Sequence, residues 1–180
     1  MSKYQKLSRL TITARNNGHS GLFSTYDMAM MMQSKHDNNF SGFLAKAFGN
    51  NTIQRVARGI YINPLAPPNP RTAIYSIAML LKWEYCNYVS LESQLSHLGV
   101  ISQQLMGRVT IMTTGRKGIF ETDYGVIEFT HTMRSIEELS DSLYFDEDIG
   151  MFRANKQRAI SDLKRVGRNV NMIEGIEYAE

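Results

Sequence analysis

All four prolines of the 180-residue chain fall within residues 63–70, in the stretch Asn-Pro-Leu-Ala-Pro-Pro-Asn-Pro. Because proline fixes φ and lacks a backbone N–H, this stretch can continue neither a helix nor a central strand. It is typical of a stiff, extended linker. A chain of this length can hold two small domains. We therefore expect one domain over residues 1–63, a linker over residues 64–70, and a second domain over residues 71–180.

Charge divides the chain in the same region. Residues 1–65 hold eight Lys/Arg and two Asp/Glu, a formal charge of +6, whereas residues 66–180 hold twelve and fifteen, a formal charge of −3. A basic domain attached to a weakly acidic one is suited to a polyanion. We expect the first domain to bind DNA. A solvated basic face without a ligand is the alternative.

Local patterns predict three helices in the first domain. Apolar residues at helical spacing indicate a helix over residues 3–16. Ser24 lies three residues before Asp27 and predicts a capping box at the start of a second helix. Asp37 or Asn38 is suited to cap a third.

A short hairpin is predicted to follow the helices. The β-prone residues 52–56 and 60–62 are separated by a turn that contains Gly59. Three helices and a hairpin make a winged helix-turn-helix, whose third helix would enter the major groove while the hairpin arginines reach the DNA backbone. The predicted DNA-binding residues are Lys35, His36, Asn38, Asn39, Ser41, Lys46, Arg55 and Arg58.

The second domain is predicted to be α+β, with helices packed on a small, largely antiparallel sheet. Its first helix covers residues 71–84, and Ser90 is expected to cap another that ends near His97. Residues 108–131 alternate like strands around a turn, and residues 154–168 form a basic amphipathic helix.

Two basic features of the second domain leave alternatives open. Residues 113–118, Thr-Thr-Gly-Arg-Lys-Gly, lack the P-loop pattern and lie between strands, so we interpret them as a basic hairpin turn and a candidate second nucleic-acid contact. The last helix presents either a solvated face or a surface for DNA, RNA or an acidic partner. Residues 146–148 are interpreted as a solvated acidic loop. The cations of the candidate surface are Arg153, Lys156, Arg158, Lys164, Arg165 and Arg168.

Three motifs, in this order along the chain, resemble the AbiEi-type antitoxins and their transcription-regulator relatives. Residues 58–61, Arg-Gly-Ile-Tyr, look like the end of that family's N-terminal winged helix. Residues 88–100 resemble its "strand, Ser, x, x, Ser, Ala, Leu, then Gly" signature, with Gln94 in place of Ala. Residues 154–162 resemble its "Ala, x, Pro, Glu, Lys, Ala, x, x, Asp" helix start, with Lys-Gln at residues 156–157 in place of Pro-Glu.

The resemblance implies the antitoxin of a type IV toxin–antitoxin system. The N-terminal domain would bind inverted repeats in its own promoter and repress the operon. The C-terminal domain would counteract a nucleotidyltransferase-like toxin without needing a stable toxin complex. No apolar run approaches the roughly 20 residues of a membrane span, and the basic N-terminus lacks the apolar core of a signal peptide, so we expect a cytoplasmic protein.

Two other functions stay open. One is a stand-alone winged-helix regulator without antitoxin activity. The other is a metal-dependent nucleic-acid-processing enzyme, which would need Glu121, Asp123 and Glu128 to converge on a metal. The acidic and histidine residues show no recognised ligand or triad spacing, and the single cysteine provides neither a disulfide nor a zinc pattern. We therefore expect no catalytic residue, metal or cofactor.

Overall fold

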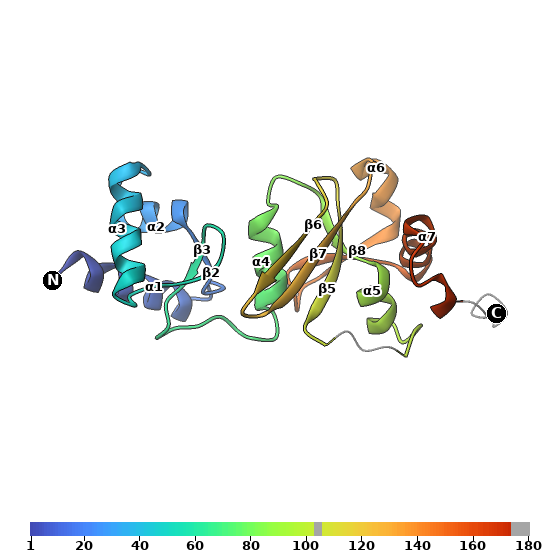
Figure 1. The fold of residues 1–180 in the computed structure, drawn as a ribbon, viewed down its shortest axis with the longest axis horizontal. Coiled ribbons are helices and arrows are strands. Elements are labelled where there is room, and N and C mark those ends of the chain that lie inside the picture. Colours follow the sequence, from blue (N-terminus) through green and yellow to red (C-terminus); the bar gives the residue numbers. More distant parts are fainter. Residues whose placement is uncertain (103–105, 174–180) are drawn as a thin grey trace. The chain divides into compact units, whose positions relative to one another are not determined.

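The computed structural model describes residues 1–102 and 106–173 (Figure 1). The chain divides into two compact units, Met1–Leu81 with Thr122–Tyr124, and Lys82–Glu121 with Gly125–Glu180. The described residues form seven α-helices and nine β-strands, so the predicted α+β class is confirmed. None of the helices in these ranges has the length and apolar character that a membrane-spanning helix needs.

The first unit alternates helices with the strands of a small sheet. Strand β3 is central and pairs antiparallel with both β1 and β2, and the register shifts between Arg55 and Ala57. The bounds are α1 Lys3–Asn16, β1 Phe23–Ser24, α2 Thr25–Met32, α3 Asn38–Gly49, β2 Gln54–Ala57, β3 Ile60–Ile62 and α4 Ala73–Leu81.

Helix starts in this unit follow from local side-chain hydrogen bonds. Ser24 and Asp27 form the predicted capping box, in which each side chain accepts a backbone N–H of the other residue. Asp37 caps α3 by accepting the N–H of Phe40 at 2.9 Å. Gln33 adopts a left-handed conformation with φ of 54° and ends α2. The predicted caps at Ser24 and Asp37 are therefore confirmed.

The core of the first unit lies between its helices and the hairpin. Asn63, at the end of the hairpin, is buried and donates from Nδ2 to Ser8 O and Thr11 Oγ1 of α1. A buried amide donor needs a hydrogen-bond partner, and these bonds satisfy that need. They also join the start of the proline-rich stretch to the first helix. The core residues are Leu7, Phe23, Met28, Ala29, Phe40, Leu44, Ala47 and Ile53.

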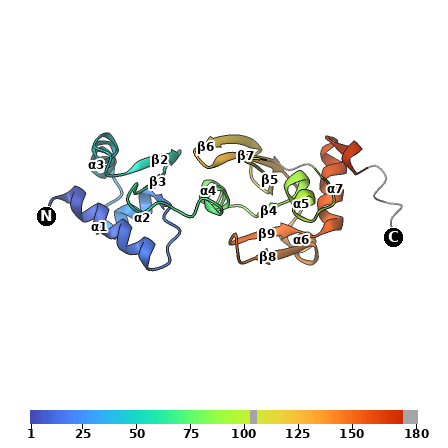
Figure 2. The ribbon, with the colours of Figure 1, turned by 90° about the horizontal axis from the view of Figure 1, so that it is seen from below.

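A six-stranded sheet organises the second unit. Figure 2 shows its strands in the order β6-β7-β5-β4-β9-β8. Helices α5 and α7 pack against each other, α5 also against β5 and α7 against β9. The bounds are β4 Asn87–Val89, α5 Leu91–His97, β5 Arg108–Thr113, β6 Gly118–Thr122, β7 Gly125–His131, α6 Ile136–Leu139, β8 Leu143–Asp146, β9 Met151–Ala154 and α7 Lys156–Val166, with short 3₁₀ helices at Ser140–Ser142 and Val170–Met172.

The sheet of the second unit differs from the prediction. It is mixed: β5 pairs with β7 and β4 with β9 in parallel, while the pairs β4–β5 and β8–β9 are antiparallel. The prediction of a largely antiparallel sheet therefore missed the two parallel pairs. The alternation in β5 suggested one buried face, but Thr110 and Met112 are buried as well. Burial of both faces is typical of strands in parallel pairs.

Two further predictions in the second unit need correction. The interpretation of residues 146–148 as a loop missed that Asp146 ends β8, whose hairpin with β9 aligns Phe145 with Phe152 across the strands. Ser90 does occupy the N-cap of α5, but its side chain makes no cap hydrogen bond. Its hydroxyl donates instead to Asp162 Oδ2 at 2.8 Å, and Leu91 begins the helix with φ of 57°.

Candidate nucleic-acid interface

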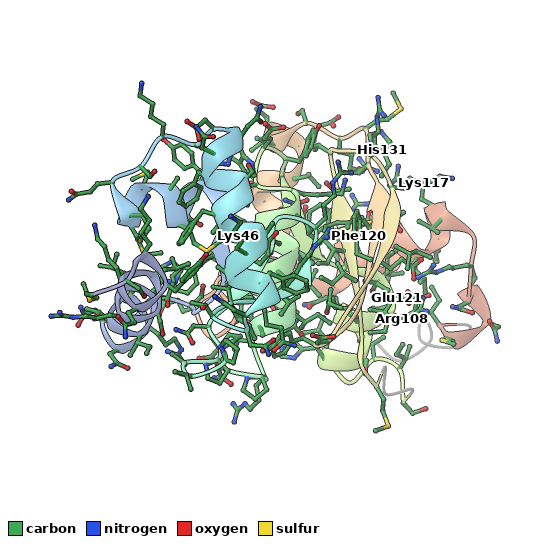
Figure 3. All side chains as sticks on the ribbon, turned by 60° about the vertical axis from the view of Figure 1, so that its left-hand side comes forward. Lys46, Arg108, Lys117, Phe120, Glu121 and His131 are labelled. Atoms are coloured by element: carbon green, nitrogen blue, oxygen red, sulfur yellow. The ribbon has the colours of Figure 1, made fainter. Side chains whose placement is uncertain are left out.

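Helix α3 has one face in the core and one in solvent. Phe40, Leu44 and Ala47 are buried against α1 and α2. Phe43 also packs against this core, and because a helix repeats every 3.6 residues, the polar positions fall on the other side of the helix. The predicted DNA-binding residues of this helix are all exposed: Asn38, Asn39, Ser41 and Lys46. Figure 3 shows Lys46 on the helix.

The segment before α3 carries the remaining two predicted residues of this region. Lys35 is exposed. His36 is also exposed, and its Nε2 lies 2.9 Å from Thr25 Oγ1 while its ring meets the Tyr26 ring edge-on. His36 therefore has partners within the unit, and its ring is held beside the start of α2. Lys35 presents its charge to solvent.

The hairpin between β2 and β3 presents two arginines. Arg55 lies on β2 and Arg58 in the turn, and both are exposed. Arg55 Nε donates to the Ala57 carbonyl at 3.2 Å, which holds its guanidinium along the hairpin. Gly59 has φ of +74°, a conformation that side chains rarely adopt and that allows the tight turn.

A basic groove lies beside the start of α3. It has a volume of about 480 Å³, and Lys3 and Lys6 of α1 line it together with Lys35. Asp37 also lines it, but one of its oxygens is used as the cap of α3. Lys3 and Lys6 are not among the predicted DNA-binding residues, because they lie about thirty residues before α3 in sequence. Their position at the start of a basic amphipathic helix was the available signal.

The cations of this region are not neutralised within the unit. The two carboxylates of residues 1–65, Asp27 and Asp37, accept backbone N–H groups at the starts of α2 and α3. In the part of the chain that the structure describes, none of the eight Lys/Arg side chains of residues 1–65 forms an ion pair. The positive potential is therefore directed to solvent, where a polyanion can release counterions on binding.

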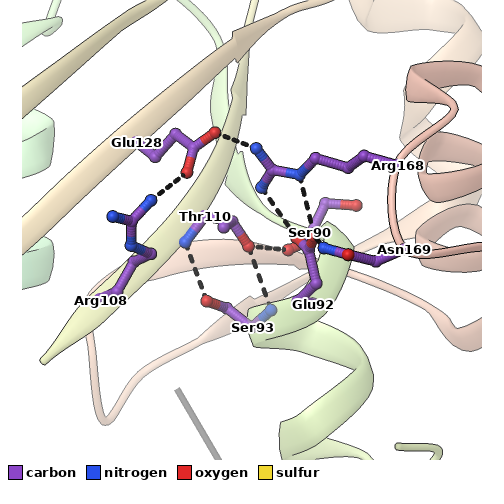
Figure 4. Close-up of polar contacts among 8 residues, drawn as sticks. All are labelled: Ser90, Glu92, Ser93, Arg108, Thr110, Glu128, Arg168 and Asn169. Atoms are coloured by element: carbon purple, nitrogen blue, oxygen red, sulfur yellow. Dashed lines mark hydrogen bonds and ion pairs between the residues drawn. The ribbon is translucent and has the colours of Figure 1, made fainter. Parts of the chain in front are cut away.

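The second unit uses its arginines differently. Arg168 binds the buried Glu92 through Nε and Nη2, at 2.9 and 3.0 Å, and also contacts Glu128. Glu128 accepts a further hydrogen bond from Arg108 at 2.8 Å, and Asn169 donates to Glu92 at 2.7 Å (Figure 4). These contacts tie α5, β5 and β7 to the segment that follows α7.

Electrostatics in this cluster favour the charged forms of both partners. Burial alone raises the pKa of Glu92, but the hydrogen bonds from Arg168 and Asn169 outweigh burial, so the pKa lies below its ordinary value. The hydrogen bonds to Glu92 and Glu128 likewise raise the pKa of the Arg168 guanidinium further above its ordinary range. This cluster therefore holds its ion pairs at neutral pH.

A second polar cluster surrounds Asp162 of α7. This carboxylate is fully buried and accepts hydrogen bonds from Tyr88 and Ser90 through Oδ2, and from Arg158 through Oδ1 at 3.0 Å. Burial and the neighbouring Asp162 charge raise the pKa of Tyr88 above its ordinary value. Two motifs that lie about seventy residues apart in sequence thus meet at one carboxylate.

The six cations of the candidate partner surface divide into two groups. Arg153 pairs with Asp146 and is buried, Arg158 pairs with Asp162, and Arg168 pairs with both glutamates of its cluster. These three serve contacts inside the unit. The other three are exposed: Lys156, Lys164 and Arg165. Arg165 Nη2 nevertheless donates to the His131 carbonyl at 3.3 Å.

The carboxylates of the metal-dependent alternative have separate environments. Glu121 and Asp123 are exposed, whereas Glu128 is buried and bound by two arginines. Across residues 1–102 and 106–173, the structure brings together no group of three or more His, Cys, Asp or Glu side chains that could hold a metal ion. Comparison of the chain with known protein families, with curated proteins and with solved structures gives no match.

Proposed function

We propose that this chain is a DNA-binding antitoxin whose first unit is a winged helix-turn-helix that represses its own operon, and whose second unit antagonises a nucleotidyltransferase-like toxin. The proposal joins the sequence resemblance to the charge distribution of the folded chain. The single observation that carries it is the exposed positive charge of α3, the β2–β3 hairpin and the basic groove, which form no ion pair among the described residues, while the two carboxylates of residues 1–65 are used as helix caps.

The element order supports a winged helix. Helices α1, α2 and α3 precede the hairpin, and β1 adds a third strand to it in the order β1-β3-β2. In this arrangement the exposed face of α3 enters the major groove, where asparagine and lysine side chains read base edges. Arg55 and Arg58 then lie beside the sugar–phosphate backbone as the wing.

The basic groove extends this footprint. With α3 in the major groove, the three lysines Lys3, Lys6 and Lys35 lie beside the start of that helix and suit a backbone phosphate. Such contacts position a protein without reading sequence, so Asn38, Asn39 and Lys46 carry the base selection. Inverted repeats would place two copies of the chain on one operator.

The antitoxin part of the proposal rests on the resemblance in the second unit. The motifs at residues 88–100 and 154–162 contribute Ser90 and Asp162, whose side chains are hydrogen-bonded at 2.8 Å. Ser93 of the motif at residues 88–100 exchanges two hydrogen bonds with Thr110 of β5, which fix the start of α5 on that strand (Figure 4). Residues of the two motifs thus contact each other in the folded unit, which supports the interpretation that the motifs belong to one family signature.

A two-part experiment in cells tests the proposal. A reporter under the DNA upstream of the gene should be repressed by the wild-type chain, and the double substitution R55A/R58A should relieve repression. In the second part, a nucleotidyltransferase-like protein encoded by the adjacent gene is expressed to stop growth. Co-expression of either the wild-type chain or R55A/R58A should restore growth of these cells. Repression that is unchanged in R55A/R58A would contradict the winged-helix assignment. Repression without growth rescue would instead support the stand-alone regulator.

A further inference from the structure

A second concave basic surface lies in the second unit, beside the turn between β5 and β6. The hollow has a volume of about 700 Å³ and opens broadly to solvent. Arg116, Lys117 and His131 lining it are exposed, and Figure 3 shows Lys117 and His131 near one end of the strands. Its lining residues are Tyr85, Thr114, Gly115, Arg116, Lys117 and His131.

The turn that carries the two cations is held in place by hydrogen bonds. Thr114 forms two hydrogen bonds with the Cys86 backbone: its hydroxyl accepts the Cys86 N–H, and its own N–H donates to the Cys86 carbonyl. The Gly115 N–H donates to Thr113 Oγ1, and His131 Nδ1 lies 2.7 Å from the Gly115 carbonyl oxygen. Since a carbonyl oxygen only accepts, Nδ1 carries the proton there.

One aromatic ring forms a wall of this hollow. Tyr85 packs so closely on Gly115 that a Cβ added to the glycine would lie 2.7 Å from the ring. The absence of a side chain at Gly115 therefore lets the ring lie flat on the turn. Tyr85 is still 43% exposed, and the Lys82 ammonium lies 5.6 Å from its ring centroid. A rigid ring with adjacent positive charge is thus presented to solvent.

The charged side chains that line the hollow are all basic. The lining includes Arg116 and Lys117 and no carboxylate. The pKa of Lys82 is lowered mainly by burial and further by the positive charge of Arg116. This surface belongs to a region whose formal charge is negative, so the positive turn is a local feature rather than a consequence of composition.

We infer that this hollow binds single-stranded nucleic acid, with an unpaired base stacked on Tyr85 and the flanking phosphates held by Arg116 and Lys117. Aromatic rings next to exposed cations are the chemistry by which proteins bind single strands with little sequence preference. A duplex suits the surface less well because its bases already stack on each other. The inference goes beyond the proposed function, since it involves neither α3 nor the β2–β3 hairpin.

The test uses the full-length chain carrying R55A/R58A, so that binding by the first unit contributes least. Fluorescein-labelled oligomers of about eight nucleotides, oligo-dT and oligo-U, serve as probes in anisotropy titrations. The additional double substitution R116A/K117A should weaken binding about tenfold or more. The matched control R9A/R71A removes two exposed cations that line neither the basic groove nor this hollow, and it should change the Kd less than about twofold. Equal loss in both would overturn the inference in favour of general charge attraction.

Stacking is tested separately from charge. Tyr85→Phe keeps the ring and should bind like the parent, whereas Tyr85→Leu keeps bulk over Gly115 but should weaken binding by about fivefold or more. An oligomer with one 2-aminopurine should lose fluorescence on binding to the parent and to Tyr85→Phe, but less with Tyr85→Leu. Quenching that is the same in all three would overturn the assignment of Tyr85.

Competition decides between ligand classes. Unlabelled oligo-dT or oligo-U should displace the probe, and a difference between them would tell whether DNA or RNA is the preferred strand. A duplex of the same length should displace it less well. A polyglutamate peptide of equal charge serves as the acidic competitor. If it displaces the probe as well as the oligomers do, and if Tyr85→Leu leaves the Kd unchanged, the inference is overturned in favour of an acidic protein partner.

Discussion

In the first unit, Arg55 and Arg58 project from the β2–β3 hairpin and form no ion pair among the described residues, whereas in the second unit Arg153, Arg158 and Arg168 each bind a buried or half-buried carboxylate. The same residue type thus serves two purposes in one chain. Exposed arginines leave their charge for a ligand, while the paired ones join elements that are far apart in sequence.

This difference has an energetic basis. Removing one partner of a buried ion pair leaves an uncompensated charge and costs about 3–5 kcal/mol, whereas an exposed cation can be removed at almost no cost in stability. Conversely, only an exposed cation can release counterions from a nucleic acid. Substitutions that break a buried ion pair should therefore change stability, whereas substitutions of exposed arginines should change binding.

The largest effect is expected for Asp162→Ala. The substitution leaves Arg158, Tyr88 and Ser90 without their shared acceptor in a fully buried position. We expect the free energy of unfolding to fall by about 3–5 kcal/mol, measured by denaturant titration. The exposed Glu147→Ala is the control and should change it by less than about 0.5 kcal/mol. Equal losses in the two variants would contradict the comparison.

Glu92→Gln should also lower stability, and the size of this loss should depend on pH. Because the folded-state pKa of Glu92 lies below the ordinary value of 4.5, its charge stabilises the fold above that pH, and the contribution disappears as the pH falls through the lower folded value. We expect a loss of about 2 kcal/mol at neutral pH, less than for a fully buried pair because Arg168 is partly exposed.

The difference between Glu92→Gln and the wild type in the free energy of unfolding should then narrow as the pH is lowered below 4.5 and through the lower folded-state pKa of Glu92. Denaturant unfolding of both proteins across a pH series measures this. A destabilisation that stays constant from neutral to acidic pH would mean that Glu92 contributes through packing alone, and not through its charge.

The opposite behaviour is expected for R55A/R58A. Specific affinity for operator DNA should fall about tenfold or more, and the slope of log Kd against log salt should decrease by about one for each lost phosphate contact. The free energy of unfolding should change by less than about 0.5 kcal/mol, because both side chains are exposed and form no ion pair among the described residues. A clear loss of stability would remove the distinction between the units.

The smallest effect concerns a carboxylate of the first unit. Asp37→Ala removes the cap of α3 and should lower the free energy of unfolding by about 1 kcal/mol. Asp37→Ser is the matched variant, because serine caps well but carries no charge, and it should retain nearly all of the stability. If both variants lose the same amount, the charge of Asp37 and not its cap stabilises this unit.

Local signals predicted the first unit well. The helix starts at Ser24 and Asp37 depend on hydrogen bonds to residues three positions away, which a sequence displays directly. The hairpin at β2 and β3 was likewise marked by Gly59. The groove at Lys3 and Lys6 was missed because it joins two helices that only the fold brings together.

Long-range partners explain the errors in the second unit. Ser90 carries a capping residue's sequence signal, yet its hydroxyl binds Asp162, which lies 72 residues away. The basic surface predicted around α7 includes Arg158 and Arg168, whose partners depend on the same packing. Composition along a predicted helix gives the number of charges but cannot tell which of them a neighbouring strand or helix neutralises.

The most direct test of the account is the affinity of the chain for the DNA upstream of its own gene and for a scrambled duplex of the same composition, measured from about 50 to about 200 mM salt. We expect the chain to bind the upstream DNA more tightly by a factor of about 10³ or more, with an affinity that weakens steeply as salt increases. Equal affinities for the two duplexes at every salt concentration would contradict it.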